Sequence, residues 1–491
     1  MIKKTTLVLT LLLLTTIVHA QWTQIGTDID GEAINDASGE SVCLNADGSI
    51  VAIGARRNEG NGVFAGHTRI YQNQSGNWIQ IGNDIDGEEA NNGAGASVSL
   101  SADGSIVAIG ATGNDGNGSG SGHVQVFKNI SGNWSQIGSD IDGEAAFDHS
   151  GISISLNSEG SIIAIGATRN TGNGTDAGHV RVYENQNDTW VQIGDDLDGE
   201  AAGDFFGRTV SLNSDGSIVA IGAPYNDGNG DGSGHARIYE NQGGTWMQIG
   251  DDIDGEAAGD TLNSVSINAD GSVVAIGGQG NDGNGIASGH VRVFENINGI
   301  WTQKGNDIDG EEAFDNSGRP EEVSLNSDGT IVAIGAVGNN GNGSFSGHVR
   351  VFQYANDLWV QVGMDIDGEA ENDMSGDSVS LSADGSVVAI GAPFNDGNGD
   401  ESGHVRVYNN PALSVIDTES IHASIYPNPV QNTLNISANF PIEKVQIYTL
   451  QGQLILQTKN NQIDVSLLSS GLYFASIMID GKSSVKKFIK N

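Results

Sequence analysis

The sequence predicts an all-β protein: a seven-bladed β-propeller followed by a small C-terminal β-sandwich. The seven tryptophans recur at spacings of 55 to 58 residues, at positions 22, 78, 134, 190, 246, 301 and 359. Each period contains four short strand-like segments, and none shows sustained helical periodicity. Residues 424–491 leave the repeat and differ from it in composition. Four short antiparallel strands repeated seven times are typical of a propeller, with one blade per period.

The four segments of one period can be followed around Thr209. They cover residues 209–213, 217–223, 235–239 and 246–249. Asp215-Gly216 is a hairpin turn signal between the first two segments. The second segment is a continuous apolar run, as expected for a strand covered on both faces. The first and third segments alternate apolar and polar residues, and a glycine-rich loop at 226–230 precedes the third.

The two ends of the repeat predict a closed ring. The chain begins with a fourth-strand segment, residues 22–26, that no first three strands precede. It ends with a third strand at residues 404–408 that lacks a fourth. Residues 22–26 should therefore complete the last blade and remove the open edge of the ring. A solenoid would instead need distinct capping repeats, and the terminal repeats have the ordinary pattern.

The chain divides into four segments. Residues 1–20 have the pattern of a signal peptide, with Lys3 and Lys4 before an apolar stretch and Val18-His19-Ala20 at the cleavage point. We expect the propeller at 21–410, a linker at 411–423 and a separate domain at 424–491. No later segment is apolar enough to predict a transmembrane span.

The formal charge of −41, from 62 acidic and 21 basic side chains, limits the partners. Such a surface repels nucleic acid phosphates and anionic lipid headgroups, which excludes nucleic-acid binding. Cations, or a neutral or basic partner, suit it better.

One repeat carries a family resemblance. Phe206-Gly207, Ile221-Gly-Ala-Pro224 and Gly234-His-Ala-Arg-Ile-Tyr239 resemble the FG-GAP repeats of integrin α-subunit propellers. The likeness extends over roughly residues 22–410, although Phe-Gly occurs in this repeat alone. The calcium loop of that family, between the first two strands of a blade, is replaced by turns such as Ala102-Asp103-Gly104. The resemblance therefore implies the fold and not the metal site of the family.

The C-terminal segment carries a second resemblance. Tyr426-Pro-Asn-Pro-Val430, Val445-Gln-Ile-Tyr448, Gly471-Leu-Tyr473 and Lys486-Lys-Phe-Ile-Lys490 resemble the type A sorting domain of the type IX secretion system. This resemblance implies a Gram-negative host and export through the periplasm. It also implies binding of residues 424–491 to the secretion machinery, and a final location at the outer cell surface or outside the cell.

Because the four strands of a blade are antiparallel, the loop after the second strand and the loop after the fourth strand emerge on the same face of the ring. The loop between the second and third strands is glycine-rich, and the loop from the fourth strand to the next blade is acidic, as in Asp252-Ile-Asp-Gly-Glu256. Counted from Asp252, this loop has carboxylates at relative positions 1, 3, 5 and 9, a spacing similar to that of the oxygen ligands in calcium-binding loops. It differs from an EF-hand in the position of its glycine and in the missing carboxylate at position 12. The alternative interpretation is a set of solvated turns. The candidate calcium ligands are Asp196, Asp198, Glu200, Asp204, Asp252, Asp254, Glu256 and Asp260.

The remaining polar residues give no catalytic constellation. A histidine follows glycine in every repeat, and seven copies around a ring cannot converge on one metal, which favours a structural role. Departures from the repeat at 147–149, 205–208 and 319–322 supply no defined nucleophile. Cys43 occupies a strand position that is serine in the next repeat, and we expect it to be structural.

Two hypotheses of function follow from these patterns. The first is a secreted or surface binding scaffold, without catalytic activity or a required cofactor, that uses its acidic face to bind a carbohydrate or protein ligand. The alternative is a polysaccharide hydrolase or lyase at the central channel. Propellers serve both kinds of function, so the fold does not decide between them.

Overall fold

The structure, a computed structural model, describes residues 21–413, 423–426, 428–438, 442–449, 454–479 and 482–490. The predicted signal peptide at residues 1–20 lies outside the described residues. Internal contacts divide the chain into two units, residues 1–414 and 415–491, which are treated separately below. Every regular element in the described part of the chain is a β-strand.

The first unit contains seven antiparallel sheets, and each is one blade. Blade 1 contains β3 (Ser41–Leu44), β4 (Ile50–Ala55), β5 (His67–Asn73), β6 (Trp78–Gln80) and β7 (Ile85–Asp86). Blade 2 contains β8 (Ala94–Leu100), β9 (Ile106–Ala111), β10 (His123–Ile130), β11 (Asn133–Gln136) and β12 (Ile141–Asp142). Blade 3 contains β13 (Ser153–Leu156), β14 (Ile162–Ala167), β15 (His179–Asn185), β16 (Trp190–Gln192) and β17 (Leu197–Asp198). Blade 4 contains β18 (Thr209–Leu212), β19 (Ile218–Ala223), β20 (His235–Asn241), β21 (Trp246–Gln248) and β22 (Ile253–Asp254).

The remaining three blades repeat the pattern. Blade 5 contains β23 (Leu262–Ile267), β24 (Val273–Gly278), β25 (His290–Ile297), β26 (Ile300–Gln303) and β27 (Ile308–Asp309). Blade 6 contains β28 (Val323–Leu325), β29 (Ile331–Ala336), β30 (His348–Ala355), β31 (Leu358–Gln361) and β32 (Ile366–Asp367). Blade 7 contains β33 (Ser378–Leu381), β34 (Val387–Ala392), β35 (His404–Asn409), β1 (Thr23–Gln24) and β2 (Ile29–Asp30). The seven sheets confirm the predicted seven-bladed propeller.

The outer edge of each blade differs in one detail from a single fourth strand. In blade 1, β6 and β7 both pair with β5 and divide the outer position between them. Gly82 lies between them with a φ of +76°, in the left-handed region that favours glycine. A Cβ on Gly82 would lie 2.8 Å from the carbonyl oxygen of Gly132 in the next blade. The break therefore follows from close contact between neighbouring blades.

The hydrophobic cores lie between successive blades. Val180 and Val182 of blade 3 pack in one cluster with Val219, Ile221 and the indole of Trp246, which belong to blade 4. The second strand is buried on both faces, which explains its continuous apolar sequence.

The repeated tryptophans connect the blades by hydrogen bonds. Each indole Nε1 donates to a carbonyl of the preceding blade; the bonds are Trp22 to Val362 (3.0 Å), Trp78 to Ile25 (2.8 Å), Trp134 to Ile81 (2.8 Å), Trp190 to Ile137 (3.0 Å), Trp246 to Ile193 (2.8 Å), Trp301 to Ile249 (2.8 Å) and Trp359 to Lys304 (2.7 Å). The tryptophan period is thus the period of the contacts between blades.

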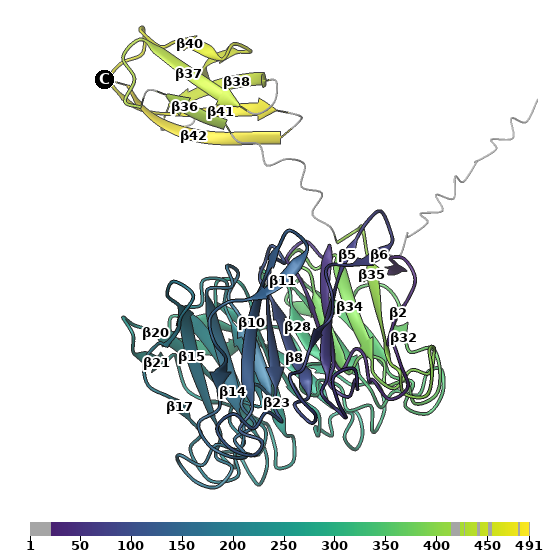
Figure 1. The fold of residues 1–491 in the computed structure, drawn as a ribbon. Coiled ribbons are helices and arrows are strands. Elements are labelled where there is room, and N and C mark those ends of the chain that lie inside the picture. Colours follow the sequence, from purple (N-terminus) through teal and green to yellow (C-terminus); the bar gives the residue numbers. More distant parts are fainter. Residues whose placement is uncertain are drawn as a thin grey trace, which may run out of the picture. The chain divides into compact units, whose positions relative to one another are not determined.

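Strands from both ends of the first unit close the ring, as the sequence predicts. Thr23 of β1 pairs with Asn409 of β35, and Ile29 of β2 pairs with Val405. Figure 1 shows β2 beside β35 and β34 at the edge where the chain returns to its start. A circle of backbone hydrogen bonds also passes through all seven blades at 2.8 to 3.0 Å, from Ala46 through Ala102, Ser158, Ser214, Ala269, Ser327 and Ala383 back to Ala46.

The first strands surround a narrow central channel. Cavities of about 140 and 220 Å³ lie along it, lined mainly by serine, valine, isoleucine and leucine side chains. Cys43 stands in this layer, and the backbone N–H of Leu100 donates to its Sγ at 3.3 Å, where other blades use a serine hydroxyl. Burial raises the pKa of the Cys43 thiol to about 11, so it remains protonated and unreactive.

The second unit is a pair of small antiparallel sheets. One contains β36 (Ala423–Tyr426), β37 (Thr433–Ala438) and β40 (Gln462–Asp464), and the other contains β39 (Leu454–Thr458), β38 (Ile442–Thr449), β41 (Gly471–Ile479) and β42 (Lys482–Lys490). Leu434 and Ile463 of the first sheet share a buried cluster with Val445, Ile477 and Phe488 of the second. Two sheets around a common core form the predicted β-sandwich.

Candidate binding face

The glycine-rich and acidic loops lie side by side on one face of the ring, called the loop face below. An asparagine of each glycine-rich loop donates through Nδ2 to the glycine carbonyl of the neighbouring acidic loop, as Asn229 does to Gly255 at 2.8 Å. The same bond occurs in all seven blades at 2.7 to 3.0 Å. The placement of both families on one face therefore agrees with the parity of the strands.

The eight candidate calcium ligands occupy three kinds of environment. Asp204 and Asp260 are buried and cap their own loops; Asp260 accepts hydrogen bonds from the backbone of Glu256 and Ala257. Asp198 and Asp254 lie on the short outer strands and pair with the histidine-bearing strand. Asp196, Asp252, Glu200 and Glu256 approach histidines instead. The carboxylates of one loop are thus directed to different partners and do not converge on one point.

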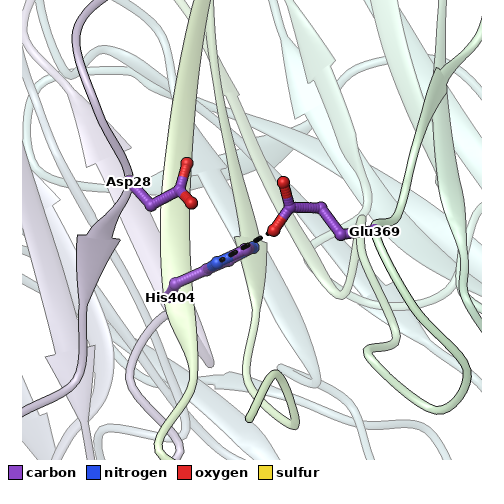
Figure 2. Close-up of side chains that lie close together, drawn as sticks. All are labelled: Asp28, Glu369 and His404. Carbon is purple, nitrogen blue, oxygen red and sulfur yellow. Dashed lines mark ion pairs between the residues drawn. The ribbon is translucent and has the colours of Figure 1, made fainter. Parts of the chain in front are cut away.

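The structure brings glutamate of one acidic loop together with aspartate of the next. Glu200 and Asp252, with His235 between them, offer ligand atoms that lie within 4.8 Å of one another. The same grouping occurs as Asp28, Glu369 and His404 (Figure 2), and also as Glu32–His67–Asp84, Glu88–His123–Asp140 and Glu144–His179–Asp196. In blades 5 and 6 the histidine–glutamate pair recurs at 3.9 Å as His290–Glu256 and His348–Glu311. Sequence spacing did not reveal these groups because their members come from successive repeats.

Five of the grouped histidines are held neutral by burial. Desolvation lowers the pKa of His67 to about 4, and the neighbouring Arg69 adds to the effect. The same causes lower the pKa of His179, His290, His348 and His404 to about 4. A neutral imidazole beside two carboxylates is a metal-ligand set or, without a metal, a polar contact between blades.

An arginine approaches six of the seven groups. Arg69 Nη1 lies 3.7 Å from Glu32 Oε1, and the equivalent arginines repeat this distance with Glu144, Glu256, Glu311 and Glu369. In blade 4, Arg237 contacts both Glu200 and Asp252. Its Nε and Nη2 donate to the two carboxylate oxygens of Asp252, each at 3.0 Å. Each guanidinium group offsets one of the two carboxylate charges of its own group. Pairing with carboxylates is typical of buried arginine.

Exposed aromatic side chains gather on the loop face. Among the described propeller residues, the exposed aromatics are Phe64, Phe147, Tyr225, Phe314 and Phe345, with 43 to 60% of each side chain accessible. All five stand in glycine-rich or acidic loops, whereas exposed aliphatic residues also occur on the outer strands. Large exposed apolar groups on one face mark an interaction surface.

Four of these aromatics have an unfavourable backbone conformation. Phe64, Phe147, Phe314 and Phe345 have φ between 52° and 70°. Other blades place glycine or asparagine at the equivalent positions of Phe147, such as Asn35 and Gly203, also at positive φ. A bulky residue costs about 1 kcal/mol or more there, and such strain is concentrated at functional sites. For Phe147 and Phe314 the sequence signal was a phenylalanine where the other repeats have asparagine or glycine.

The inner rim of the loop face carries a charged cluster at the channel mouth. It contains Glu40, Arg56, Arg208, Arg319, Glu321 and Asp377. Arg56 Nε lies 2.7 Å from Glu40 Oε1, and Arg319 lies 3.8 Å from Asp377. Burial raises the pKa of Glu321 to about 8 despite the nearby Arg208, so its carboxyl is largely protonated at neutral pH. Several of these residues come from the departures from the repeat at 205–208 and 319–322.

A cavity of about 650 Å³ adjoins this rim between blades 1 and 2. Arg56, Arg57, Phe64 and Asn91 line it, so cationic, aromatic and amide groups face one volume. Arg57 also stacks over the ring of Phe394 with its Cζ 5.2 Å from the ring centroid. The loop face is therefore acidic on its outer part and mixed in charge at its centre.

Comparisons with known proteins agree with this architecture. Residues 197–239 match the family model of the FG-GAP repeat, and residues 424–491 match that of the secretion system C-terminal sorting domain. No match was found among curated proteins. Hydrazine synthase from Kuenenia stuttgartiensis is similar in structure, with a TM-score of 0.51 and 12% identity, over 79% of this chain and 97% of that one. A protein described as a 6-phosphogluconolactonase from Bacteroides uniformis aligns with a TM-score of 0.48 and 12% identity, over 69% and 88%.

The fold and the sorting domain together define an exported β-propeller protein. More particularly, its propeller contains an FG-GAP repeat at residues 197–239 and the chain carries a secretion system sorting domain at residues 424–491, which confirms both resemblances in the sequence. The sorting domain directs export to the cell surface or secretion. Among the described residues, no helix is long and apolar enough to cross a membrane. The identity to the solved structures is too low to indicate more than a shared fold.

Proposed function

We propose that the protein is a binding protein that presents the loop face of its propeller to a carbohydrate, at the cell surface or outside the cell. The observation that carries this proposal is the set of strained, exposed aromatics on that face. Flat aromatic rings pack against the apolar faces of sugar rings, while carboxylates, amides and arginines bond to the hydroxyls. Repetition around the ring would allow several weak contacts to act together on one polymer.

The test compares loop-face variants with an outer-strand control. Glycan binding is measured on the chain spanning residues 21–491, with Phe147→Asn, Phe314→Asn and the double variant. Ile300→Thr is the control, because Ile300 is equally exposed on β26 but lies off the loop face. We expect the double variant to lose binding and the control to retain it. Equal binding by all four proteins would contradict the proposal, and binding of protein ligands alone would replace the carbohydrate with a protein partner.

We also propose that the acidic loops bind calcium. Several carboxylates within one face repel one another, and a cation that binds only the folded form stabilises it. We expect calcium to raise the melting temperature more than sodium at matched ionic strength, since general screening acts through both salts. Asp252→Ala combined with Asp254→Ala should reduce the increment. Identical melting in both salts would assign these loops to solvated turns.

One observation favours the alternative, a polysaccharide-active enzyme at the channel mouth. A protonated Glu321 close to the carboxylates of Asp377 and Glu40 has the pairing of acid and base that glycoside hydrolysis uses. Incubation with the bound glycan distinguishes the two functions. If the protein shortens the glycan and Glu321→Gln abolishes this activity, the protein is an enzyme. If the glycan stays intact, binding is its function.

A further inference from the structure

Blade 2 departs from the other blades at the histidine–carboxylate group. Its group contains Glu88, His123 and Asp140, whose ligand atoms lie within 4.8 Å of one another. The arginine that follows the histidine by two residues in the other blades is here Gln125. Among the described residues, no lysine or arginine forms an ion pair with Glu88 or Asp140. Two carboxylates therefore face each other in blade 2 without the guanidinium that neutralises them elsewhere.

The histidine of this group is buried and has a free nitrogen. His123 is 2% exposed, and its Nδ1 has no hydrogen-bond partner. That nitrogen lies 3.5 Å from Asp140 Oδ2. A tetrahedral zinc ion with bonds of about 2.1 Å holds its ligand atoms about 3.4 Å apart, so this separation fits two ligands of one ion.

Gln125 completes the polar surroundings. It is buried, and its Nε2 donates to Glu88 Oε1 at 3.2 Å and to Asp140 Oδ1 at 3.0 Å. Rotation of its amide by half a turn exchanges the nitrogen for Oε1, a neutral oxygen ligand. A cavity of about 380 Å³ adjoins the group on the side of Glu88 and Gln125, which line it together with Gln136.

We propose that Glu88, His123 and Asp140 bind one zinc-like divalent transition-metal ion, and that this site is specific to blade 2. Imidazole with two carboxylates suits zinc, whereas calcium prefers oxygen ligands alone. The ion supplies the positive charge that arginine supplies in the other blades. Glu88 and Asp140 hold the positions in their acidic loops that Glu200 and Asp252 hold among the candidate calcium ligands, and His123 is the ligand that makes this group suit zinc. The site is distinct from the aromatic surface.

The test exchanges the residue that distinguishes blade 2 from its neighbours. Zinc content and affinity are measured by calorimetry and elemental analysis on untagged residues 21–491, in millimolar calcium to fill sites for hard cations. We expect one zinc ion per chain in the unaltered protein. Gln125→Arg installs the residue that other blades accept, so the variant should fold, melt normally and bind no zinc. His123→Gln and Asp140→Asn should also lose the ion.

The reciprocal change provides a gain of function. Arg181→Gln in blade 3 removes the guanidinium beside Glu144 and leaves His179 and Asp196 in place. We expect this variant to bind two zinc ions. Retention of zinc by Gln125→Arg, no zinc in the unaltered protein, or a zinc ion in every blade would each overturn the proposal. If Arg181→Gln does not fold, the outcome with Gln125→Arg decides alone.

Discussion

At the residue scale, the environment of each repeated histidine is determined by carboxylates that come from successive repeats. His235 meets Glu200 from one acidic loop and Asp252 from the next, residues that are far apart in the sequence. The regular Gly-His pattern predicted a repeated structural role and could not show these partners, because it describes one repeat at a time. Cys43 was simpler to predict, since its position is defined by the serines of neighbouring repeats.

The buried histidines should make the stability of the ring depend on pH. His67, His179, His290, His348 and His404 have pKa values near 4, below the usual 6.5. As the pH falls below 6.5, the unfolded chain binds protons first, and each histidine costs up to about 1.4 kcal/mol per pH unit. We expect the melting temperature to fall from pH 7 to pH 5.5.

The carboxyls of the acidic loops oppose this effect at lower pH. Burial raises the pKa of Glu32, Glu311 and Glu369, so the folded state takes up their protons first and gains stability as they titrate. Above pH 5.5 Glu321, whose pKa is raised to about 8, also opposes the histidines, but the five histidines outnumber it. His290→Gln should reduce the slope of melting temperature against pH, and a flat profile in the unaltered protein would contradict the assignment of neutral imidazoles.

The indole hydrogen bonds allow the closing interface to be compared with an internal one. Trp22→Phe and Trp246→Phe each remove one bond to a carbonyl of the preceding blade. We expect both to destabilise the ring by about 1 to 3 kcal/mol, because a carbonyl loses its partner and the core loses volume. Thermal or denaturant unfolding measures the two losses. A large loss for Trp246→Phe with none for Trp22→Phe would show that the closing blade is not held as the others are.

At the element scale, the sequence predicted the strands closely and the loops less closely. The run Ile218–Ala223 is apolar because both of its faces are covered, and it forms the predicted strand. The division of the outer strand into β6 and β7 was not predicted, because it depends on the approach of Gly132 in the next blade to Gly82. The aromatic surface was also missed, since its members occur in only some repeats.

Relieving strain in the loops should separate stability from binding. Asparagine adopts a positive φ more readily than phenylalanine, so Phe147→Asn and Phe314→Asn should each raise stability by about 1 kcal/mol. The same changes remove exposed ring surface from the proposed binding face. We expect higher melting temperatures with weaker glycan binding. Lower stability would show that these rings contribute packing that outweighs their backbone strain.

At the scale of the whole molecule, the period alone predicted the ring, its seven blades and the face that the loops share. These features depend on counting and on strand parity, which a sequence displays directly. The charged cluster at the channel mouth was not predicted, because residues from blades 1, 4, 6 and 7 meet there only when the ring is closed.

Removal of the second unit should leave the ring intact. The two units have separate contact networks, and β1 and β2 complete blade 7 without any residue beyond β35. A chain ending at residue 413 should therefore melt as the propeller does in the full chain, yet remain inside the cell envelope. Cell fractionation of the producing bacterium measures the second effect. Export of the shortened chain at the normal level would contradict the role of the sorting domain.

The position of β35 has a mechanical consequence. It is the last strand before the sorting domain, and it is bonded to β34 on one side and to β1 and β2 on the other. Tension that acts on the tail along the axis of β35 would be carried by two antiparallel neighbours in shear, which loads many hydrogen bonds at once instead of opening them one by one. The beginning of the chain thus anchors its end, and a pull on the tail is resisted by the closure of the ring.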